Sequence, residues 1–533
     1  MEGMEVKLER PKTAFYQPHR TSPHNGSSLN ILAILDDFSS LSFSDGANLW
    51  RLSPDDVGID EPLVKPDFLL VESAWAGNFD TWKFKVTTKN GPAPVLKTLV
   101  KRCKALGIPT VFWNKEDPPH FEDFIETAKL FDHIFTTEES KIGEYYARTE
   151  ASSVDLLRFA ANPAIHNPAW VEDYRAGDIA FAGMYFKHKY PERRKQIDQL
   201  FPPATNYKFE IYSRHAGGDS RYQFPEPFDS YIVGRLPYEE MVRAYRKYKI
   251  FLNLNSVPNS KSMCARRVFE LSAAKTAVVG MHSDAIRSIY DESEVLLAND
   301  ESEVREIYEF LLGDELGRRR LTQRAWRKTL STHTYRYRIA QMAKTVGIEI
   351  PDQPVRIVLM LDKVKSYEHA SKILGQAYNQ RFTFPREVKF GWFLSSETRT
   401  MLTMSEIVDL ENSFGPQIVG DLAGCHIVYI NAEFELGTFY LNDLLLMSEQ
   451  MKTDFVAKSI GSLETVRETE ERFSSSLPPH GWMSGIIGSR DVSELIAQEN
   501  AINVGGKAPT VYVGDPFGIA KFQLGETSPL LSG

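Results

Sequence analysis

The sequence predicts an α/β protein made of two doubly wound units, followed by a third α/β unit at the C-terminal end. Short apolar runs that fit buried parallel strands alternate with helical patterns along the chain. Polar residues follow the carboxyl ends of these runs, which is where doubly wound sheets bind their ligands. The length of 533 residues and the hydrophobic content of 42% suffice for several domains, each with its own core.

Composition narrows the classes of function and the cellular compartment. The net charge of −9 gives no global basic field, so we expect no long nucleic-acid footprint. The cysteines Cys103, Cys264 and Cys425 lie far apart, which fits a reducing cytoplasm and gives no zinc spacing. No apolar run reaches the roughly 18–20 residues that span a membrane, and the N-terminus lacks a signal-peptide core. We expect a cytoplasmic protein, with attachment to the inner face of the membrane left open.

The first unit follows a polar stretch at residues 1–28, which is expected to form a flexible N-terminal arm. This unit covers residues 29–165. Its strands are expected at 29–35, 66–71, 110–113 and 133–137, with a helix at 95–106. The largely apolar character of these runs predicts a buried parallel sheet.

The second unit, residues 166–350, repeats this plan, and a linker is expected at 347–354. Its strands are expected at 178–182, 209–212, 250–255 and 276–280, and its helices at 192–200, 238–247, 267–275, 302–312 and 315–332. The third unit, residues 351–533, has expected strands at 356–361, 387–394 and 426–431, and helices at 366–380 and 439–450. The apolar face of the last helix predicts core packing.

Arg267 and Glu270 open the helix that follows the strand at 250–255 and the polar loop at 256–265. A cation at a helix N-terminus can meet the phosphates of a nucleotide. A carboxylate one turn further on can accept hydrogen bonds from ribose hydroxyls. The pattern therefore predicts a nucleotide-sugar site. A surface ion pair without net effect on stability is the alternative interpretation of the same residues.

Five stretches carry a resemblance to a known family: Val111-Phe-Trp-Asn-Lys-Glu-Asp-Pro118, Phe131-Asp-His-Ile-Phe-Thr-Thr137, Phe159-Ala-Ala-Asn-Pro163, Phe181-Ala-Gly183 and Arg267-Val-Phe-Glu270. With these motifs, residues 29–345 resemble the CgeB-like glycosyltransferases of bacteria, a group related to spore-maturation and cell-surface glycosylation proteins. The resemblance implies a GT-B architecture, in which two Rossmann-like domains face a cleft. It also implies a hexosyltransferase-like enzyme.

The resemblance implies that the second unit binds a nucleoside-diphosphate sugar as co-substrate, without a metal ion or another cofactor. Gly183 would allow close approach of the donor to the backbone. The cations expected to neutralise the diphosphate are Arg267, Arg214 and Lys261, the loop residues expected to face the phosphates are Asn255 and Ser256, and Glu270 is expected to hold the ribose. Arg214 and Lys261 also fit ordinary surface residues, and Gly183 also fits a tight turn.

The first unit would bind the acceptor. Glu116, Asp117 and His120 share one loop after a predicted strand, and Asp37 follows another, so each is a candidate for the base that deprotonates an acceptor hydroxyl. Glu-Asp-Pro is also a good turn sequence, and His120 also fits a capping or packing role. The tryptophans Trp75, Trp82 and Trp113 fit either stacking on a sugar or the core, with the core favoured for Trp113.

The third unit resembles a family 2 glycosyltransferase domain of the GT-A type, through its opening strand and helix at 355–380 and the stretch from Tyr440 to Leu444. The metal-binding aspartates of that family correspond to a position near Asn431, where only Glu433 supplies a carboxylate, and a divalent ion needs several oxygen ligands. We therefore expect a degenerate domain for acceptor binding, packing or dimerisation. A second active transferase, using Asp362 and Asp443, is the alternative.

The main hypothesis is a metal-independent transferase acting on a hydroxyl of a cell-surface polymer precursor, glycolipid or similar carbohydrate or lipid-linked acceptor. Glu270→Ala is then expected to abolish turnover with little change in melting temperature. A non-catalytic carbohydrate-binding scaffold and a transferase for modified nucleobases are the alternatives, and a homodimer stays open. Five arginines, Arg318, Arg319, Arg320, Arg324 and Arg327, fit a basic membrane-contact patch, with a solvated helix face favoured.

Overall fold

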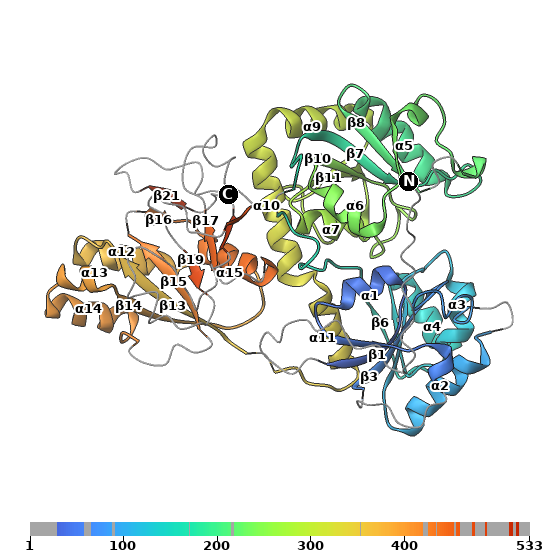
Figure 1. Ribbon diagram of the computed structural model, residues 1–533, viewed down its shortest axis with the longest axis horizontal. Helices are drawn as coiled ribbons and strands as arrows, with labels where there is room; N and C mark the ends of the chain where they lie inside the picture. Colours follow the sequence, from blue (N-terminus) through green and yellow to red (C-terminus); the bar gives the residue numbers. More distant parts are fainter. Residues whose placement is uncertain are drawn as a thin grey trace, which may run out of the picture.

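The computed structural model describes residues 29–57, 66–87, 91–169, 171–214, 218–351, 353–418, 425–432 and 434–451, with five short strands beyond residue 451. Three domains are visible in Figure 1: the first (blue) lies below the second (green), and the third (orange) lies to one side. The predicted N-terminal arm at 1–28 falls outside the described residues.

The first domain is a six-stranded parallel sheet in the order β2-β1-β3-β4-β5-β6. Its elements are β1 (Asn30–Ile34), α1 (Asp37–Phe43), β2 (Asn48–Arg51), β3 (Phe68–Glu72), α2 (Pro94–Ala105), β4 (Thr110–Asn114), α3 (Phe121–Ala128), β5 (His133–Thr136), α4 (Ile142–Arg148) and β6 (Ser153–Leu156). Strands β3 and β4 are buried along their whole length because they are apolar on both faces. The strand order changes direction between β1 and β3, which is where such a sheet binds ligands.

The second domain is also a six-stranded parallel sheet, in the order β12-β11-β10-β7-β8-β9. Its elements are β7 (Gly177–Gly183), α5 (Pro191–Ala204), β8 (Phe209–Ser213), β9 (Ile232–Gly234), α6 (Tyr238–Tyr245), β10 (Tyr248–Asn253), α7 (Arg267–Ala273), β11 (Ala277–Met281), α8 (Asp284–Arg287), β12 (Leu296–Ala298), α9 (Glu301–Gly313) and α10 (Glu315–Thr332). Counted from β7, the order is 3-2-1-4-5-6, the arrangement of dinucleotide-binding sheets, with its switch point between β7 and β10.

Helix α11 (Tyr335–Thr345) returns the chain from the second domain to the first (Figure 1). Tyr335 and Ile339 are buried in the core of the first domain, and the Tyr335 ring meets Phe43 edge-on at 4.6 Å between ring centroids. The sequence predicts that this helix belongs to the second unit, residues 166–350. It packs on the first domain because its apolar residues complete that core.

The third domain contains a seven-stranded mixed sheet in the order β14-β13-β15-β19-β17-β20-β18 and a pair formed by β16 and β21. Its elements are β13 (Val355–Asp362), α12 (Tyr367–Tyr378), β14 (Val388–Leu394), α13 (Ser396–Thr400), α14 (Met404–Phe414), β15 (His426–Asn431), β16 (Phe434–Leu436), α15 (Tyr440–Met451), β17 (Phe455–Lys458), β18 (Arg472–Ser474), β19 (Gly485–Ile487), β20 (Val511–Gly514) and β21 (Ile519–Lys521). The mixed α/β class predicted for this unit is therefore observed.

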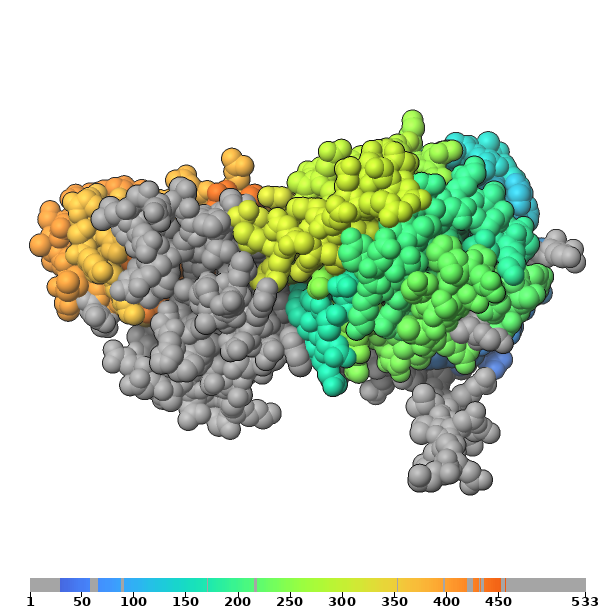
Figure 2. Space-filling view, turned by 90° about the horizontal axis from the view of Figure 1, so that it is seen from above, coloured from blue at the N-terminus to red at the C-terminus, as the bar shows by residue number. Residues whose placement is uncertain are grey.

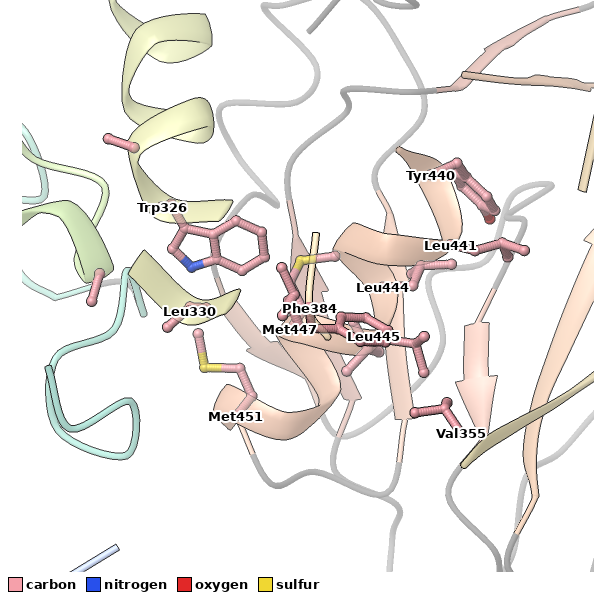
Figure 3. Packing of buried hydrophobic residues seen from close by; sticks show 14 of the residues in the cluster. Trp326, Leu330, Val355, Phe384, Tyr440, Leu441, Leu444, Leu445, Met447 and Met451 are labelled. Atoms are coloured by element: carbon pink, nitrogen blue, oxygen red, sulfur yellow. The ribbon is translucent and has the colours of Figure 1, made fainter. Parts of the chain in front are cut away.

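The third domain joins the molecule through helices α15 and α10. Trp326 and Leu330 on α10 share one hydrophobic cluster with Leu444, Met447 and Met451 on α15, as Figure 3 shows at close range. Figure 2 shows the orange third domain meeting the rest of the molecule beside the yellow segment that includes α10. The apolar face of the predicted helix at 439–450 is thus core, as expected.

A buried polar network reinforces this contact. Asp443 accepts hydrogen bonds from Arg327 Nε at 2.6 Å, Arg327 Nη2 at 2.8 Å and Gln323 Nε2 at 3.0 Å. Trp326 Nε1 donates to Gln450 Oε1 at 2.8 Å, and Gln450 Nε2 donates to the carbonyl of Ala273 at 3.0 Å. Because Ala273 ends helix α7, this network connects the third domain to the back of the second.

Two carboxylates proposed for a second active site serve other contacts. Asp443 is held by the network just described, and Asp362 accepts hydrogen bonds from Ser395 at 2.6 Å and from the Tyr429 hydroxyl. The third, Glu433, lies outside the described residues. A structural role for Asp443 therefore replaces the catalytic role considered for it, because a fully buried ion pair to Arg327 occupies it.

The arginines of α10 do not form the single exposed face that the sequence predicts. Arg327 is 5% exposed because it faces Asp443, and Arg318 is 8% exposed and donates to the Leu311 carbonyl at 2.5 Å. The expectations of a membrane-contact patch and of a solvated face are both wrong for these two residues. Among the described residues, no helix combines the length and the apolar character needed to cross a membrane.

Replacing Asp443 by Asn tests the docking of the third domain. The change leaves the Arg327 guanidinium buried without a counter-charge, so we expect a loss of about 3 kcal/mol, in the range for a broken buried ion pair. Calorimetry should show the transition that involves the third domain at a lower temperature. Asp409→Asn, at an exposed position on α14, is the control; equal melting profiles for both variants would show that the ion pair does not hold the domain.

Candidate functional site

The loops after strands β5 and β10 contact each other across the interface of the first two domains. Ser260 Oγ donates to Glu138 Oε2 at 2.5 Å, and Ser262 Oγ donates to the Thr137 carbonyl at 3.1 Å. The backbone N–H of Glu139 donates to Ser262 Oγ at 2.8 Å. The carboxyl ends of the two sheets therefore face each other, so residues at both switch points can act on one ligand.

Three arginines gather at the carboxyl edge of the second sheet. Arg193 lies on α5, Arg214 directly follows β8, and Arg267 begins α7. Burial and repulsion by Arg267 lower the pKa of Arg193 to about 10, and partial burial with repulsion by Arg266 and Arg267 lowers the pKa of Arg214. Within the described part of the chain, neither Arg193, Arg214 nor Arg267 forms an ion pair with a carboxylate. Such a cluster of cations favours an anionic ligand.

Polar atoms without internal partners surround these arginines. Buried side-chain atoms for which the described residues supply no hydrogen-bond partner include Arg193 Nε, Arg267 Nε, Ser213 Oγ, Asn253 Oδ1 and Asn255 Nδ2. Buried polar atoms in native proteins are almost always hydrogen-bonded. Since β8 and β10 flank β7, these atoms lie at the switch point of the sheet, where they are available to a polar ligand.

The remaining residues predicted for donor binding lie near this edge. Ser256 accepts a hydrogen bond from Arg193 at 3.3 Å, and buried Asn255 is held through its backbone by Gln196. Lys261 is exposed in the loop after β10. Gly183 ends β7, and a Cβ there would lie 2.6 Å from the Phe181 ring, so packing alone already requires glycine. The structure brings Gly183, Asn255 and Ser256 to one edge, and Lys261 lies further along the loop that follows β10. The contacts of all four residues with a donor stay a prediction.

Glu270 has a different environment from the one expected for a ribose ligand. Its side chain is fully buried, and it accepts hydrogen bonds from Tyr238 at 2.9 Å, Tyr245 at 2.7 Å and Arg266 at 2.9 Å. Burial opposes its charge, but Arg266, the hydrogen bond from Tyr245 and the other nearby cations together lower the pKa of Glu270 to about 2. The ion pair of the helix is thus made by Arg266, and both carboxylate oxygens of Glu270 are engaged within the protein.

The Glu270 network reaches the first domain. The Arg266 guanidinium lies 3.8 Å above the Phe38 ring of α1, and Tyr238 meets the same ring edge-on at 5.1 Å. Buried His166, whose pKa burial lowers to about 4, contacts the Tyr238 hydroxyl through Nε2 at 2.8 Å. A neutral His166 that donates from Nε2 lets Tyr238 donate to Glu270 in turn. Glu270 therefore fixes Arg266 and Tyr238 where the two domains meet.

A buried charged cluster at the switch point of the first sheet was not predicted. Lys115 Nζ donates to Glu72 Oε1 at 3.0 Å and to Asp36 Oδ2. The side chains of Glu72, Lys115 and Asp36 are 0%, 6% and 34% exposed, so only Asp36 is accessible to a ligand. Burial and the charge of Asp36 raise the pKa of Glu72 to about 8. Burial opposes the ionisation of Asp36, but Lys115, the backbone N–H of Ser39 and Arg266 together lower the pKa of Asp36.

The four residues predicted as candidates for the catalytic base lie in different environments. Asp117 is fully buried and accepts hydrogen bonds from Asn114, Thr136 and Tyr145 at 2.6–2.9 Å, and burial raises its pKa to about 7. This set of contacts favours a structural role, which fixes the turn after β4. Its neighbour Glu116 is half-buried. Burial and the negative charge of Glu116 raise the pKa of Tyr190 in the second domain, so Glu116 lies near that domain.

His120 and Asp37 lie outside the charged cluster. His120 Nδ1 contacts Asp123 Oδ2 at 2.7 Å, and its ring meets Trp75 edge-on, which agrees with the packing alternative. Asp37 is exposed, and its ion pair to Arg51 spans 3.7 Å. Of the three tryptophans considered for stacking, Trp82 and Trp113 are fully buried, and Trp75 is 38% exposed.

Sequence reasoning missed Asp36, Glu72, Lys115, Arg193 and Arg266. Glu72 and Lys115 were visible as polar residues at strand ends, and Asp36 adjoins the predicted Asp37. No spacing along the chain shows that they meet, because β3 and β4 bring them together. Among the described residues, no three His, Cys, Asp or Glu side chains are grouped as metal ligands.

Residues 193–344 match a family model described as glycosyl transferase-like, and the three arginines lie within this stretch. No curated protein matches the chain. The two-domain arrangement predicted as GT-B is confirmed by the two facing doubly wound sheets. The narrower resemblance to the CgeB-like group and the GT-A type of the third domain stay predictions.

Solved structures with a similar fold include an alpha-glucosyltransferase in complex with UDP and a DNA containing a HMU base, at 12% identity and a TM-score of 0.42 over 60% of this chain and 100% of that one. A mutant of T4 phage BGT in complex with UDP-glucose has 12% identity and a TM-score of 0.39 over 60% and 100%. A glycosyltransferase from Rickettsia africae has 9% identity and a TM-score of 0.39 over 60% and 98%. All three likenesses are distant.

Replacing Glu270 by Ala should destabilise the protein, in contrast to the small effect expected from sequence. The change leaves Arg266, Tyr238 and Tyr245 without their shared acceptor, and a broken buried ion pair costs roughly 3 kcal/mol or more. The melting temperature measures this effect. Glu301→Ala, on the exposed pair with Arg305, is the control; an unchanged melting temperature in Glu270→Ala would contradict the assigned role.

Glu72→Gln should remove a pH dependence of stability. Because the pKa of Glu72 is about 8 in the folded protein and near 4.5 when unfolded, the folded state holds its proton more tightly between these values. Folding stability should therefore fall as pH rises from 4.5 to 8, by up to about 1.4 kcal/mol per pH unit from this group. Melting temperatures at pH 5 and pH 8 should differ less in the variant than in the wild type; parallel curves would contradict the shift.

Proposed function

We propose that this protein is a glycosyltransferase that moves a sugar from a nucleoside-diphosphate sugar to a hydroxyl group of an acceptor. One observation carries the proposal. Arg193, Arg214 and Arg267 converge without carboxylate partners, within the described residues, at the switch point of a dinucleotide-type sheet. All three belong to the stretch that matches the glycosyl transferase-like model. A diphosphate is an anion, so it would supply the negative charge that the three arginines do not receive from carboxylates among the described residues.

The arginines would act on the leaving group. When the bond between the sugar and the diphosphate breaks, negative charge develops on the departing phosphate oxygen. Guanidinium groups already in place lower the energy of that charge, because they need no reorganisation during the reaction. Arg267 and Arg193 each offer, in addition to their terminal nitrogens, a buried Nε–H for which the described residues supply no partner. We propose on this basis that transfer needs no metal ion.

The first domain would present the acceptor. Its switch point faces the arginine cluster, and Trp75 keeps 38% of its surface exposed on the loop after β3, where an aromatic ring can cover the face of a sugar. The overall charge of −9 favours a carbohydrate or lipid-linked acceptor over a long nucleic acid. We propose a cell-surface polymer precursor or glycolipid as the acceptor class.

A thermal-shift screen tests the donor site. UDP is the first nucleotide to test, since it is the one named with both phage T4 BGT and the alpha-glucosyltransferase above. Ligands that bind only the folded state raise the melting temperature, so UDP and a donor among UDP-glucose, UDP-galactose and UDP-N-acetylglucosamine should raise it equally with and without EDTA. No shift with any nucleotide would favour a non-catalytic scaffold, and a shift abolished by EDTA would contradict metal independence.

Arg267→Ala should weaken UDP binding by about tenfold or more, since a hydrogen bond to a charged group is worth roughly 1.5–3 kcal/mol. Isothermal titration calorimetry measures the dissociation constant. Arg305→Ala, which removes a half-exposed arginine of α9 that already pairs with Glu301, is the matched control and should bind like the wild type. Equal binding by Arg267→Ala and the wild type would exclude the arginine cluster as the diphosphate site.

A further inference from the structure

Asp36, Glu72 and Lys115 form one cluster although they follow three different strands. Asp36 lies two residues after β1, Glu72 ends β3, and Lys115 directly follows β4. The pairing of β1 with β3 and of β3 with β4 brings the three strand ends side by side. The cluster thus occupies the ligand-binding switch point of the first sheet.

Hydrogen bonds fix the orientation of the Asp36 carboxylate. Its Oδ1 accepts from the backbone N–H of Ser39 at 2.7 Å, and its Oδ2 accepts from Lys115. The backbone N–H of Asp36 donates to Glu72 Oε1 at 2.5 Å, and Lys115 also donates to the Ser39 hydroxyl at 3.2 Å. Glu72 Oε2 is buried, and the described residues supply no hydrogen-bond partner for it. A rigid frame of buried groups therefore holds one accessible carboxylate.

The accessible carboxylate lies where the first domain meets the donor side. Phe38, two residues after Asp36, lies under the Arg266 guanidinium at 3.8 Å, and Arg266 acts electrostatically on Asp36. Arg266 directly precedes Arg267 of the arginine cluster. The contact between Phe38 and Arg266 thus connects the segment that carries Asp36 to the segment that carries Arg267.

We propose that Asp36 is the catalytic base of this enzyme, with Lys115 and Glu72 as its positioning residues. The proposal deepens the proposed function and rests on it. Asp36 combines three properties that no other candidate shares: an accessible carboxylate, fixed orientation, and a place facing the donor domain. Asp117 is fully buried, His120 packs against Trp75, and Asp37 lies outside the cluster. Glu116 lies near the second domain, but the described residues supply no hydrogen bond that fixes the orientation of its carboxylate.

The step is a substitution at the anomeric carbon. The acceptor oxygen forms a bond to that carbon while its proton passes to an Asp36 carboxylate oxygen. The bond from the anomeric carbon to the diphosphate oxygen breaks, and the nucleoside diphosphate leaves with the electron pair. Asp36 later releases the proton to solvent. In the absence of an acceptor, water takes the same place, and the products are the free sugar and UDP.

Asp36→Asn tests the assignment of the base. Asparagine is as good a helix N-cap as aspartate, so α1 should keep its start, while the amide cannot take up a proton. With the UDP-sugar that the wild type turns over, UDP release should fall about 100-fold or more in kcat, the usual range for losing a general base. The dissociation constant of UDP should stay within about threefold of the wild type, because the contacts of Asp36 among the described residues are with Ser39, Lys115 and Glu72 and not with the arginine cluster.

Three further variants complete the design. Asp409→Asn, on the third domain, is the control for an exposed aspartate and should turn over like the wild type. Asp37→Asn tests the neighbouring carboxylate: turnover lost there and kept in Asp36→Asn would overturn the assignment. Lys115→Arg should retain more turnover than Lys115→Met, since only arginine keeps a cation beside Asp36; equal loss in both would contradict the positioning role of Lys115.

The outcomes distinguish this proposal from the function on which it rests. If the wild type neither binds UDP nor releases it from any UDP-sugar, the proposed function fails. If the wild type turns over and Asp36→Asn does so equally, only the assignment of the base fails. Loss of UDP binding together with turnover in Asp36→Asn would also overturn the assignment, because it would place Asp36 in the donor site.

Discussion

The ion pair between the fully buried Glu270 and the partly buried Arg266 is the constraint on which the candidate site depends. A carboxylate without exposed surface needs a full set of partners, and Tyr238, Tyr245 and Arg266 supply them. Arg266 in turn covers Phe38 of the first domain. One buried charge therefore sets the start of helix α7, the position of the following arginine and the contact between two domains.

The two sides of the interface carry charge in different ways. In the second domain, three guanidinium groups stay without carboxylates among the described residues and keep polar atoms free, so their charge is available to a ligand. In the first domain, Lys115 is enclosed by Asp36 and Glu72, so its charge is used internally to orient one carboxylate. Open cations suit an anion that arrives and leaves, whereas an enclosed cation suits a group that must keep its orientation.

The third domain contacts the end of helix α7 that lies away from the candidate site. Gln450 of helix α15 donates to the last carbonyl of α7, so the helix that begins with Arg267 ends against the third domain. Asp443 and Arg327 hold the two domains in that position through a buried ion pair. The packing role that the sequence suggested for this unit therefore has a specific target. The same aspartate that resembled a catalytic residue is needed for docking.

The sequence by itself determined the longer strands of the first two domains, because buried parallel strands are continuous apolar runs, and with them the α/β class and the strand ends at which ligands bind. It did not show β2, β6, β9 and β12, which have three or four residues each and are partly exposed. Only the tertiary structure decided which polar residues meet. Asp36 pairs with Lys115, which lies 79 positions away in the sequence, and Glu270 pairs with Arg266. Strand order and burial select these partners, and both are properties of the whole fold that residue spacing does not show.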